Sequence, residues 1–222
     1  MSAFPERRRY ELLLGAILLS ILVFPTLARE GLDAAWLAVV VFSVLLIAAL
    51  NAAGGARKAQ AVVFLTGIGA FVSAWMSVLV EMDGLPYVRH ALTAAFFGGV
   101  TVTVLRRVLA PGRVTGERVT AAICVYLLLG LLWASAYSLL LTWAPGAIRF
   151  PEGADGHAVT YFSFVTLTTL GYGEITPVHP LARSLAFLQA ATGVLYVAVL
   201  VARLVALQIV HAADEDDQRS SS

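Results

Sequence analysis

The sequence predicts an all-α integral membrane protein with six transmembrane helices. Of its 222 residues, 59% are hydrophobic and only 13% are charged, and the mean hydropathy is +0.85. A soluble chain of this length could not shield so much apolar surface from water. The apolar residues also gather in stretches that are long enough to cross a bilayer as helices. These stretches lie at about 11–28, 34–53, 60–80, 86–110, 117–143 and 180–211.

The basic residues between the stretches predict how the chain is oriented. Nine of them fall on the side of the N-terminus: Arg7, Arg8, Arg9, Arg57, Lys58, Arg106, Arg107, Arg113 and Arg118. Four fall on the other side: Arg29, Arg89, Arg149 and Arg183. The positive-inside rule then places both termini of a multi-pass protein of the cell membrane in the cytoplasm.

The first apolar stretch also has a competing interpretation. Three arginines at 7–9, an apolar run and Thr26-Leu27-Ala28 together form a pattern that is typical of a signal peptide. The length of the apolar run favours a retained membrane helix over a cleaved leader.

Residues 161–177 contain the most informative motif of the chain. An apolar, threonine-rich segment of helical length leads into Thr169-Leu170-Gly171-Tyr172-Gly173. Glycine has no Cβ and accepts positive φ, so alternating glycines let successive carbonyl groups turn toward one axis. Irregular backbone at membrane depth is tolerated only where protein buries it or where it lines water. The alternative interpretation is a glycine-rich turn that only connects two membrane helices.

This segment resembles the pore helix and selectivity filter of the potassium channel family, whose filter is usually Thr-Val-Gly-Tyr-Gly. The resemblance covers about 117–211. It implies a pore domain over 113–212, built from an outer helix, a re-entrant pore helix, the filter loop and an inner helix. A four-helix N-terminal membrane domain over 1–112 precedes it, and a short acidic cytoplasmic tail over 213–222 follows.

The resemblance also implies what the loop binds. Potassium ions would be coordinated by Thr169, Leu170, Gly171 and Tyr172 as transported cargo, and no cofactor is expected. A closed ring of carbonyl groups needs four loops and the chain supplies one, so a homotetramer is implied. The expected function is passive, potassium-selective flux.

The residues expected to support the filter are Tyr161, Phe162, Val165, Thr168 and Glu174. Val165 lies where some family members carry a glutamate behind the filter, so carboxylate coupling is not expected there. Glu174 replaces the more usual aspartate, and Leu170 replaces a valine that is stiffer at its Cβ. These departures leave a weakly selective cation channel as an alternative.

The last apolar stretch contains candidate gating residues. Gly193 lies 20 residues after Gly173, a spacing that resembles the hinge glycine of the family's inner helix. A glycine that allows close helix packing is the alternative. The residues expected to line the inner pore recur every four positions: Val197, Val201, Val205 and Ile209. This stripe could instead face lipid or the stretch at 117–143.

The stretch at 86–110 carries Arg89 and Arg106-Arg107, with no lysine or arginine between them. A voltage sensor needs a ladder of such charges, so we expect interfacial anchors and no intrinsic voltage gating. A non-conducting regulatory subunit, whose first four helices bind another membrane protein, is a further alternative. Nothing in the sequence predicts an enzyme or a nucleic-acid partner, since no His, Asp, Glu or Ser cluster in the stretches has catalytic spacing.

Overall fold

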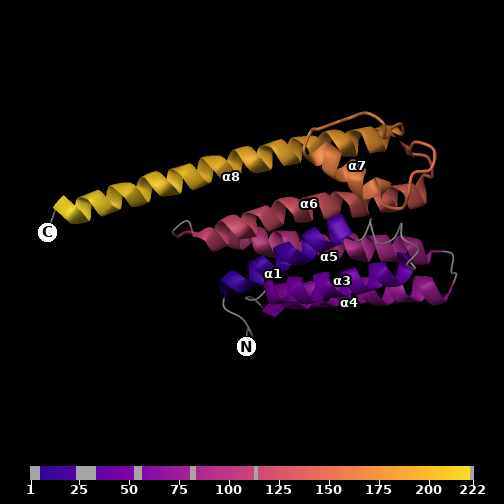
Figure 1. Ribbon diagram of the computed structural model, residues 1–222, viewed down its shortest axis with the longest axis horizontal. Coiled ribbons are helices and arrows are strands. Elements are labelled where there is room, and N and C mark those ends of the chain that lie inside the picture. Colours follow the sequence, from indigo (N-terminus) through magenta and orange to yellow (C-terminus); the bar gives the residue numbers. More distant parts are fainter. Residues whose placement is uncertain (1–5, 24–33, 53–56, 81–83, 113–114, 221–222) are drawn as a thin grey trace.

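The computed structural model describes residues 6–23, 34–52, 57–80, 84–112 and 115–220. Long helices lie side by side along one axis, and the last extends well beyond the others (Figure 1). The elements are α1 (Glu6–Leu18), the π-helical turn η1 (Leu19–Val23), α3 (Ala34–Ala52), α4 (Arg57–Leu79), α5 (Leu85–Val108), α6 (Gly116–Trp143), β1 (Ile148–Arg149), α7 (Ala158–Leu167), β2 (Thr176–Pro177) and α8 (Pro180–Ser220).

Four of these helices are long and apolar enough to cross a membrane. The apolar windows are Gln60–Ser77, Leu85–Val108, Gly116–Trp143 and Pro180–Arg203. They correspond to the last four predicted spans. The predicted span at 11–28 runs past residue 23, where the described part of the chain breaks off, and the apolar part of α3 is the shorter Val40–Ala52. Six spans therefore remain a prediction.

The first four helices and α6 share one hydrophobic core. Helix α5 packs along both α4 and α6, and α1 packs on α3 and α6. Leu13 of α1, Val63 of α4, Phe96 of α5 and Val125 of α6 are fully or almost fully buried in this core. The aromatic rings of Phe42 and Phe96 join α3 to α5 with their centroids 5.3 Å apart. The N-terminal helices are thus packed directly on α6.

Three residues shape the turn between α5 and α6. Gly112 has a φ of 124°, which allows the chain to turn after α5. The hydroxyl of Thr115 accepts the backbone N–H of Arg118 and caps α6. The Arg118 guanidinium donates to the carbonyl groups of Ala110, Pro111 and Gly112 at 3.0, 2.8 and 2.9 Å. These bonds satisfy carbonyl groups of the turn that follows α5.

Helix α8 also binds the segment that follows α5. The guanidinium of Arg203 donates to the Leu109 carbonyl group, next to the carbonyl groups bound by Arg118. The segment 109–112 that follows α5 is thereby bound by arginine side chains from both α6 and α8.

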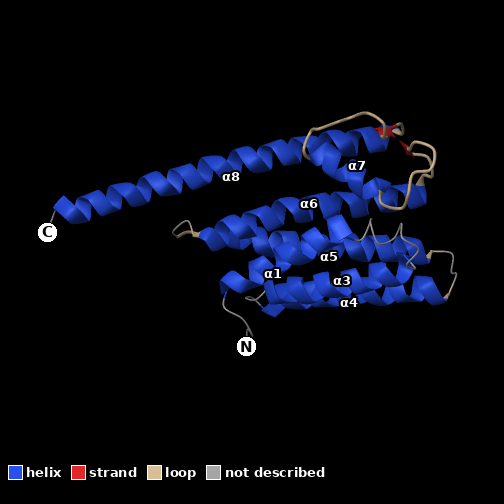
Figure 2. Ribbon diagram, viewed as in Figure 1, coloured by secondary structure: helices blue, strands red, loops and turns tan. Residues whose placement is uncertain are grey.

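Helix α7 and two short strands lie around the motif at residues 169–173. The short helix α7 packs against both α6 and α8. The two-residue strands β1 and β2 pair antiparallel beside it, with Ile148 opposite Pro177 (Figure 2). Tyr137 of α6, Ile148 and Phe162 of α7 form a separate small core. Residues 144–157 are therefore more than an exposed loop, because Ala147 and Ile148 are buried.

The single cysteine of the sequence, Cys124, lies inside the bundle. Its side chain is fully buried, and its sulfur lies 3.5 Å from the carbonyl oxygen of Tyr10 on α1. The residue behaves as a small apolar group at the contact between α1 and α6.

Candidate functional site

The loop Thr168–Glu174 follows α7 directly and has an unusual backbone. Thr169, Gly171 and Gly173 have φ values of 58°, 58° and 95°, whereas the residues between them have no positive φ. A positive φ at every second residue is neither helical nor extended, and it allows successive carbonyl groups to turn toward one axis. Thr169 takes this conformation without being glycine, which costs energy and is typical of functional loops.

Hydrogen bonds fix the start of this loop to α7. The backbone N–H of Thr169 donates to the Thr166 carbonyl group at 3.0 Å, and that of Leu170 donates to the Val165 carbonyl group at 2.9 Å. The backbone N–H of Thr168 donates to Phe164 at 3.0 Å. These bonds satisfy carbonyl groups at the end of the helix, so the first residues of the loop are held in register with α7.

The predicted filter residues are exposed in the single chain. All residues from Thr168 to Glu174 are exposed. The exposed fractions reach 54% for Leu170 and 68% for Tyr172, the two large side chains of the motif. Clustered exposed apolar surface usually marks a contact with another molecule.

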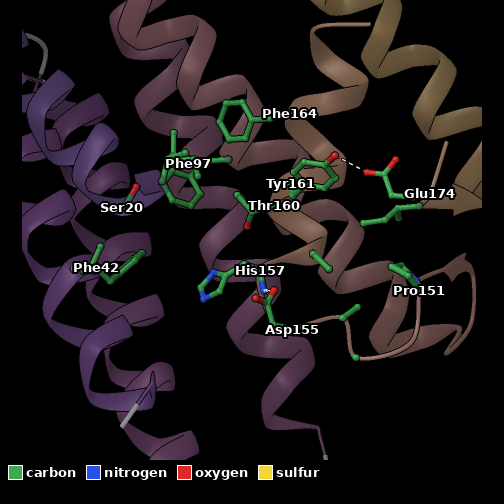
Figure 3. A pocket seen from close by; sticks show the side chains of 18 of the residues that line it. Ser20, Phe42, Phe97, Pro151, Asp155, His157, Thr160, Tyr161, Phe164 and Glu174 are labelled. Atoms are coloured by element: carbon green, nitrogen blue, oxygen red, sulfur yellow. Dashed lines mark hydrogen bonds between the residues drawn. The ribbon is translucent and has the colours of Figure 1, made fainter. Parts of the chain in front are cut away.

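The two aromatic residues expected to support the filter point in different directions. Phe162 is buried and its ring meets that of Tyr137 edge to face, with centroids 5.0 Å apart. Tyr161 is exposed, and its hydroxyl donates to the Glu174 carboxylate at 2.5 Å (Figure 3). This bond raises the pKa of the Tyr161 phenol to about 12. Glu174, despite being longer than aspartate, closes a brace across the loop.

A pocket of about 730 Å³ opens beside this brace. One wall comes from the N-terminal helices, with Phe42 of α3 and Phe97 of α5. The other comes from Tyr161, Phe164 and the polar segment 151–157 before α7 (Figure 3). Its volume is in the range of small-molecule sites. The N-terminal helices therefore lie across a cavity from the residues that support the loop.

Gly193 lies within α8 and touches α7. A Cβ atom built on it would lie 2.1 Å from the carbonyl oxygen of Leu167. The phenol of Tyr126 on α6 also donates to this oxygen, at 3.4 Å. This contact supports the close-packing interpretation of the glycine, and a hinge at Gly193 stays a prediction.

The predicted inner-pore valines lie on exposed parts of α8. Val197, Val201 and Val205 are 46%, 53% and 53% exposed. Their neighbour Tyr196 instead packs against the core shared by α1 and α6 and donates to the Ala122 carbonyl group at 2.7 Å. The side chain of Ile209 lies outside the part of the chain whose side chains are described.

The basic residues of α5 lie near its two ends. Arg89, in the first turns, donates to the Ser77 hydroxyl at 3.1 Å. Arg106 and Arg107 are in the last turn, where Arg107 donates to the Tyr10 hydroxyl at 3.2 Å. Positive side chains in the last turn suit the negative end of the helix dipole. Among the described residues, no group of three or more His, Cys, Asp or Glu side chains could hold a metal ion.

Sequence reasoning missed one set of residues beside the loop. Tyr137, Ser163 and Gln189 are fully buried and hydrogen-bonded to one another across α6, α7 and α8. A signal was present, because Gln189 is an amide within the apolar window Pro180–Arg203. Polar side chains inside membrane helices usually face the protein interior and find a partner there.

Comparison with known proteins finds a similarity for this region. A family model described as an ion channel matches residues 121–208, which include most of α6, all of α7, the loop and much of α8. No curated protein and no solved structure matches the chain. Residues 121–208 therefore resemble the pore region of ion channels.

Proposed function

We propose that four copies of this chain form a channel that lets potassium ions cross the cell membrane passively and selectively. The observation that carries the proposal is the alternating φ of Thr169, Gly171 and Gly173 at the end of a short helix. That helix packs against two candidate membrane helices of an ion channel domain. Carbonyl groups of residues 169–172 would replace the water shell of the ion.

The exposure of the loop supports a tetramer. Each chain has one such loop, and a ring of carbonyl groups that surrounds an ion needs four. Leu170 and Tyr172 expose much of their side chains in the single chain. Contact with neighbouring subunits in a ring with cyclic symmetry would cover this surface.

The Tyr161–Glu174 hydrogen bond supports selectivity. A filter that discriminates between ions must hold its carbonyl groups in place, and a charge-assisted hydrogen bond is among the stronger means of doing so. The added methylene of Glu174 does not prevent this bond. A weakly selective cation channel remains the second candidate, because Leu170 is less constrained at its Cβ than the valine of the family pattern.

We further propose that the channel has six spans per subunit, with both termini in the cytoplasm, and no intrinsic voltage sensor. The arginines of α5 lie toward its ends, and two of them, Arg89 and Arg107, bind neighbouring groups within the chain. A sensor needs several charges distributed through the membrane-spanning part.

Ion flux into vesicles that contain the purified chain tests the proposal. With opposed potassium and sodium gradients, we expect flux that follows the potassium gradient. Gly171→Ala should impair selective flux, because a Cβ at a φ of 58° costs energy, as it already does at Thr169, and this further cost falls within the filter loop. Gly146→Ala is the matched control. Gly146 also has positive φ, 85°, and a Cβ there would meet nothing within 4 Å, but it lies in the turn after α6.

Each outcome of the flux experiment has a defined meaning. Equal permeability to potassium and sodium would replace the selective channel with a general cation channel. An intact tetramer that conducts only when a second membrane protein is added would favour a regulatory subunit. Equal loss of flux in the Gly171 and Gly146 variants would remove the assigned role of the loop.

A further inference from the structure

A chain of buried hydrogen bonds joins the three helices around the loop. The Tyr137 hydroxyl of α6 donates to Gln189 Oε1 of α8 at 2.8 Å. Gln189 Nε2 donates to both the carbonyl oxygen and the hydroxyl oxygen of Ser163 on α7, each at 2.8 Å. The Ser163 hydroxyl in turn donates to the Gly130 carbonyl group of α6 at 2.7 Å. The chain thus begins and ends on α6 and passes through α8 and α7.

These bonds satisfy the polar side chains completely. The side chains of Tyr137, Ser163 and Gln189 are each 0% exposed. Both ends of the Gln189 amide have partners, and the Ser163 hydroxyl both donates and accepts. A buried network in which every group is paired favours one arrangement of its helices, whereas losing one partner leaves another group unpaired.

The contacts of α8 with α7 also share a helical register. Ser163 and Leu167 are one turn apart on α7, and Gln189 and Gly193 are one turn apart on α8. Gln189 binds Ser163, while Gly193 lies against the Leu167 carbonyl group. A shift of α8 would therefore act on α7 at two points, the second of which directly precedes the filter loop.

We propose that Gln189 is a positioning residue for the filter. It fixes α7 against the outer and inner helices and so sets where the filter loop begins. This inference rests on the proposed function and goes beyond it, because it states that the buried Gln189 side chain holds the filter loop in position. Val165, where some channels of this type place a glutamate, supplies no polar side chain here. The Gln189 network lies on another face of α7 and ties it to both neighbours.

The test compares Gln189→Met and Tyr137→Phe with the wild-type chain. Methionine is similar in size to glutamine but cannot form these bonds, and phenylalanine keeps the ring that packs on Phe162. Ser138→Ala is the matched control, because the Ser138 hydroxyl binds only the Ala134 carbonyl group within α6. Each variant is first checked for tetramer assembly in detergent.

Hydrogen exchange of residues 158–173 is the first readout and does not depend on conduction. We expect these amides to exchange about tenfold faster in Gln189→Met, as follows from leaving buried partners unpaired. Exchange in α3 should stay unchanged. The variant that carries both Tyr137→Phe and Gln189→Met should exchange at the same rate as Gln189→Met alone, because both substitutions interrupt the same network.

Selective flux is the second readout. We expect the potassium-to-sodium permeability ratio to fall in Gln189→Met and to stay at the wild-type value in Ser138→Ala. Unchanged exchange over 158–173 in an assembled Gln189→Met tetramer would overturn the inference, as would a wild-type permeability ratio. Absence of flux from the wild-type chain would instead refute the proposed channel, and the exchange measurement would still decide whether Gln189 positions α7.

Discussion

Replacing Gly193 by alanine tests the contact between α7 and α8 most directly. The added Cβ would lie 2.1 Å from the Leu167 carbonyl oxygen, whereas real Cβ atoms essentially never come within 3.0 Å of another heavy atom. The obstacle is backbone, so no side chain can rotate away to make room. The two helices must separate by about 1 Å, and close-packed interiors resist such shifts.

The expected cost follows from three contributions. Overpacking a well-packed site typically costs about 1–3 kcal/mol. The Gln189–Ser163 hydrogen bonds one turn away would lengthen, and weakening them costs about 1 kcal/mol more. Alanine is better than glycine inside a helix by about 1 kcal/mol, which offsets part of this. We therefore expect Gly193→Ala to lower the free energy of unfolding by about 2 kcal/mol per subunit, or ~30-fold in the unfolding equilibrium.

Thermal unfolding of the protein in detergent measures this effect, with Gly15→Ala as the matched control. Gly15 also lies inside a helix, but a Cβ there would meet nothing within 4 Å. The control should be neutral or slightly more stable. The reasoning would be refuted if Gly193→Ala unfolded at the wild-type temperature or above it. A variant of wild-type stability with altered channel opening would favour the hinge interpretation.

Three further outcomes are expected. Tyr161→Phe removes the hydrogen bond to Glu174, and it should lower the potassium-to-sodium permeability ratio in vesicle flux. The unfolding temperature should stay close to the wild-type value, because the pair is exposed. An unchanged permeability ratio would contradict this prediction. Arg118→Lys should lower the unfolding temperature in detergent, because lysine cannot donate to all three carbonyl groups as the guanidinium does. An unchanged unfolding temperature would show that these hydrogen bonds do not stabilise the protein. Replacing Arg106 and Arg107 by glutamine should leave the conductance–voltage curve of reconstituted channels unchanged, whereas loss of a steep voltage dependence would reveal a sensor.

The sequence could predict the elements whose signal is local. The apolar stretches at 60–80, 86–110, 117–143 and 180–211 match candidate membrane helices because each carries its own signal in consecutive residues. The loop at 169–173 was identifiable for the same reason, since glycine is the residue that most readily adopts positive φ. The ion channel interpretation of this region is confirmed by the family match.

Contacts between distant residues could not be predicted in this way. Tyr137 and Gln189 are 52 positions apart, and only the packing of three helices brings them together. The same holds for Gly193, whose spacing from the filter suggested a hinge but whose neighbour is the end of α7. The pairing of Ile148 with Pro177 also joins residues 29 positions apart, so it depends on how the pore helix folds back.

The burial of Cys124 has a practical consequence for chemical labelling. The chain has one thiol, and it lies where a polar reagent in water cannot reach it. Thiol-reactive probes require an accessible thiolate. A cysteine introduced at an exposed position such as Glu152 would then be the site that reacts, with no need to remove the native one first. Distances between subunits could accordingly be measured by spin or fluorophore labels in an otherwise unaltered protein.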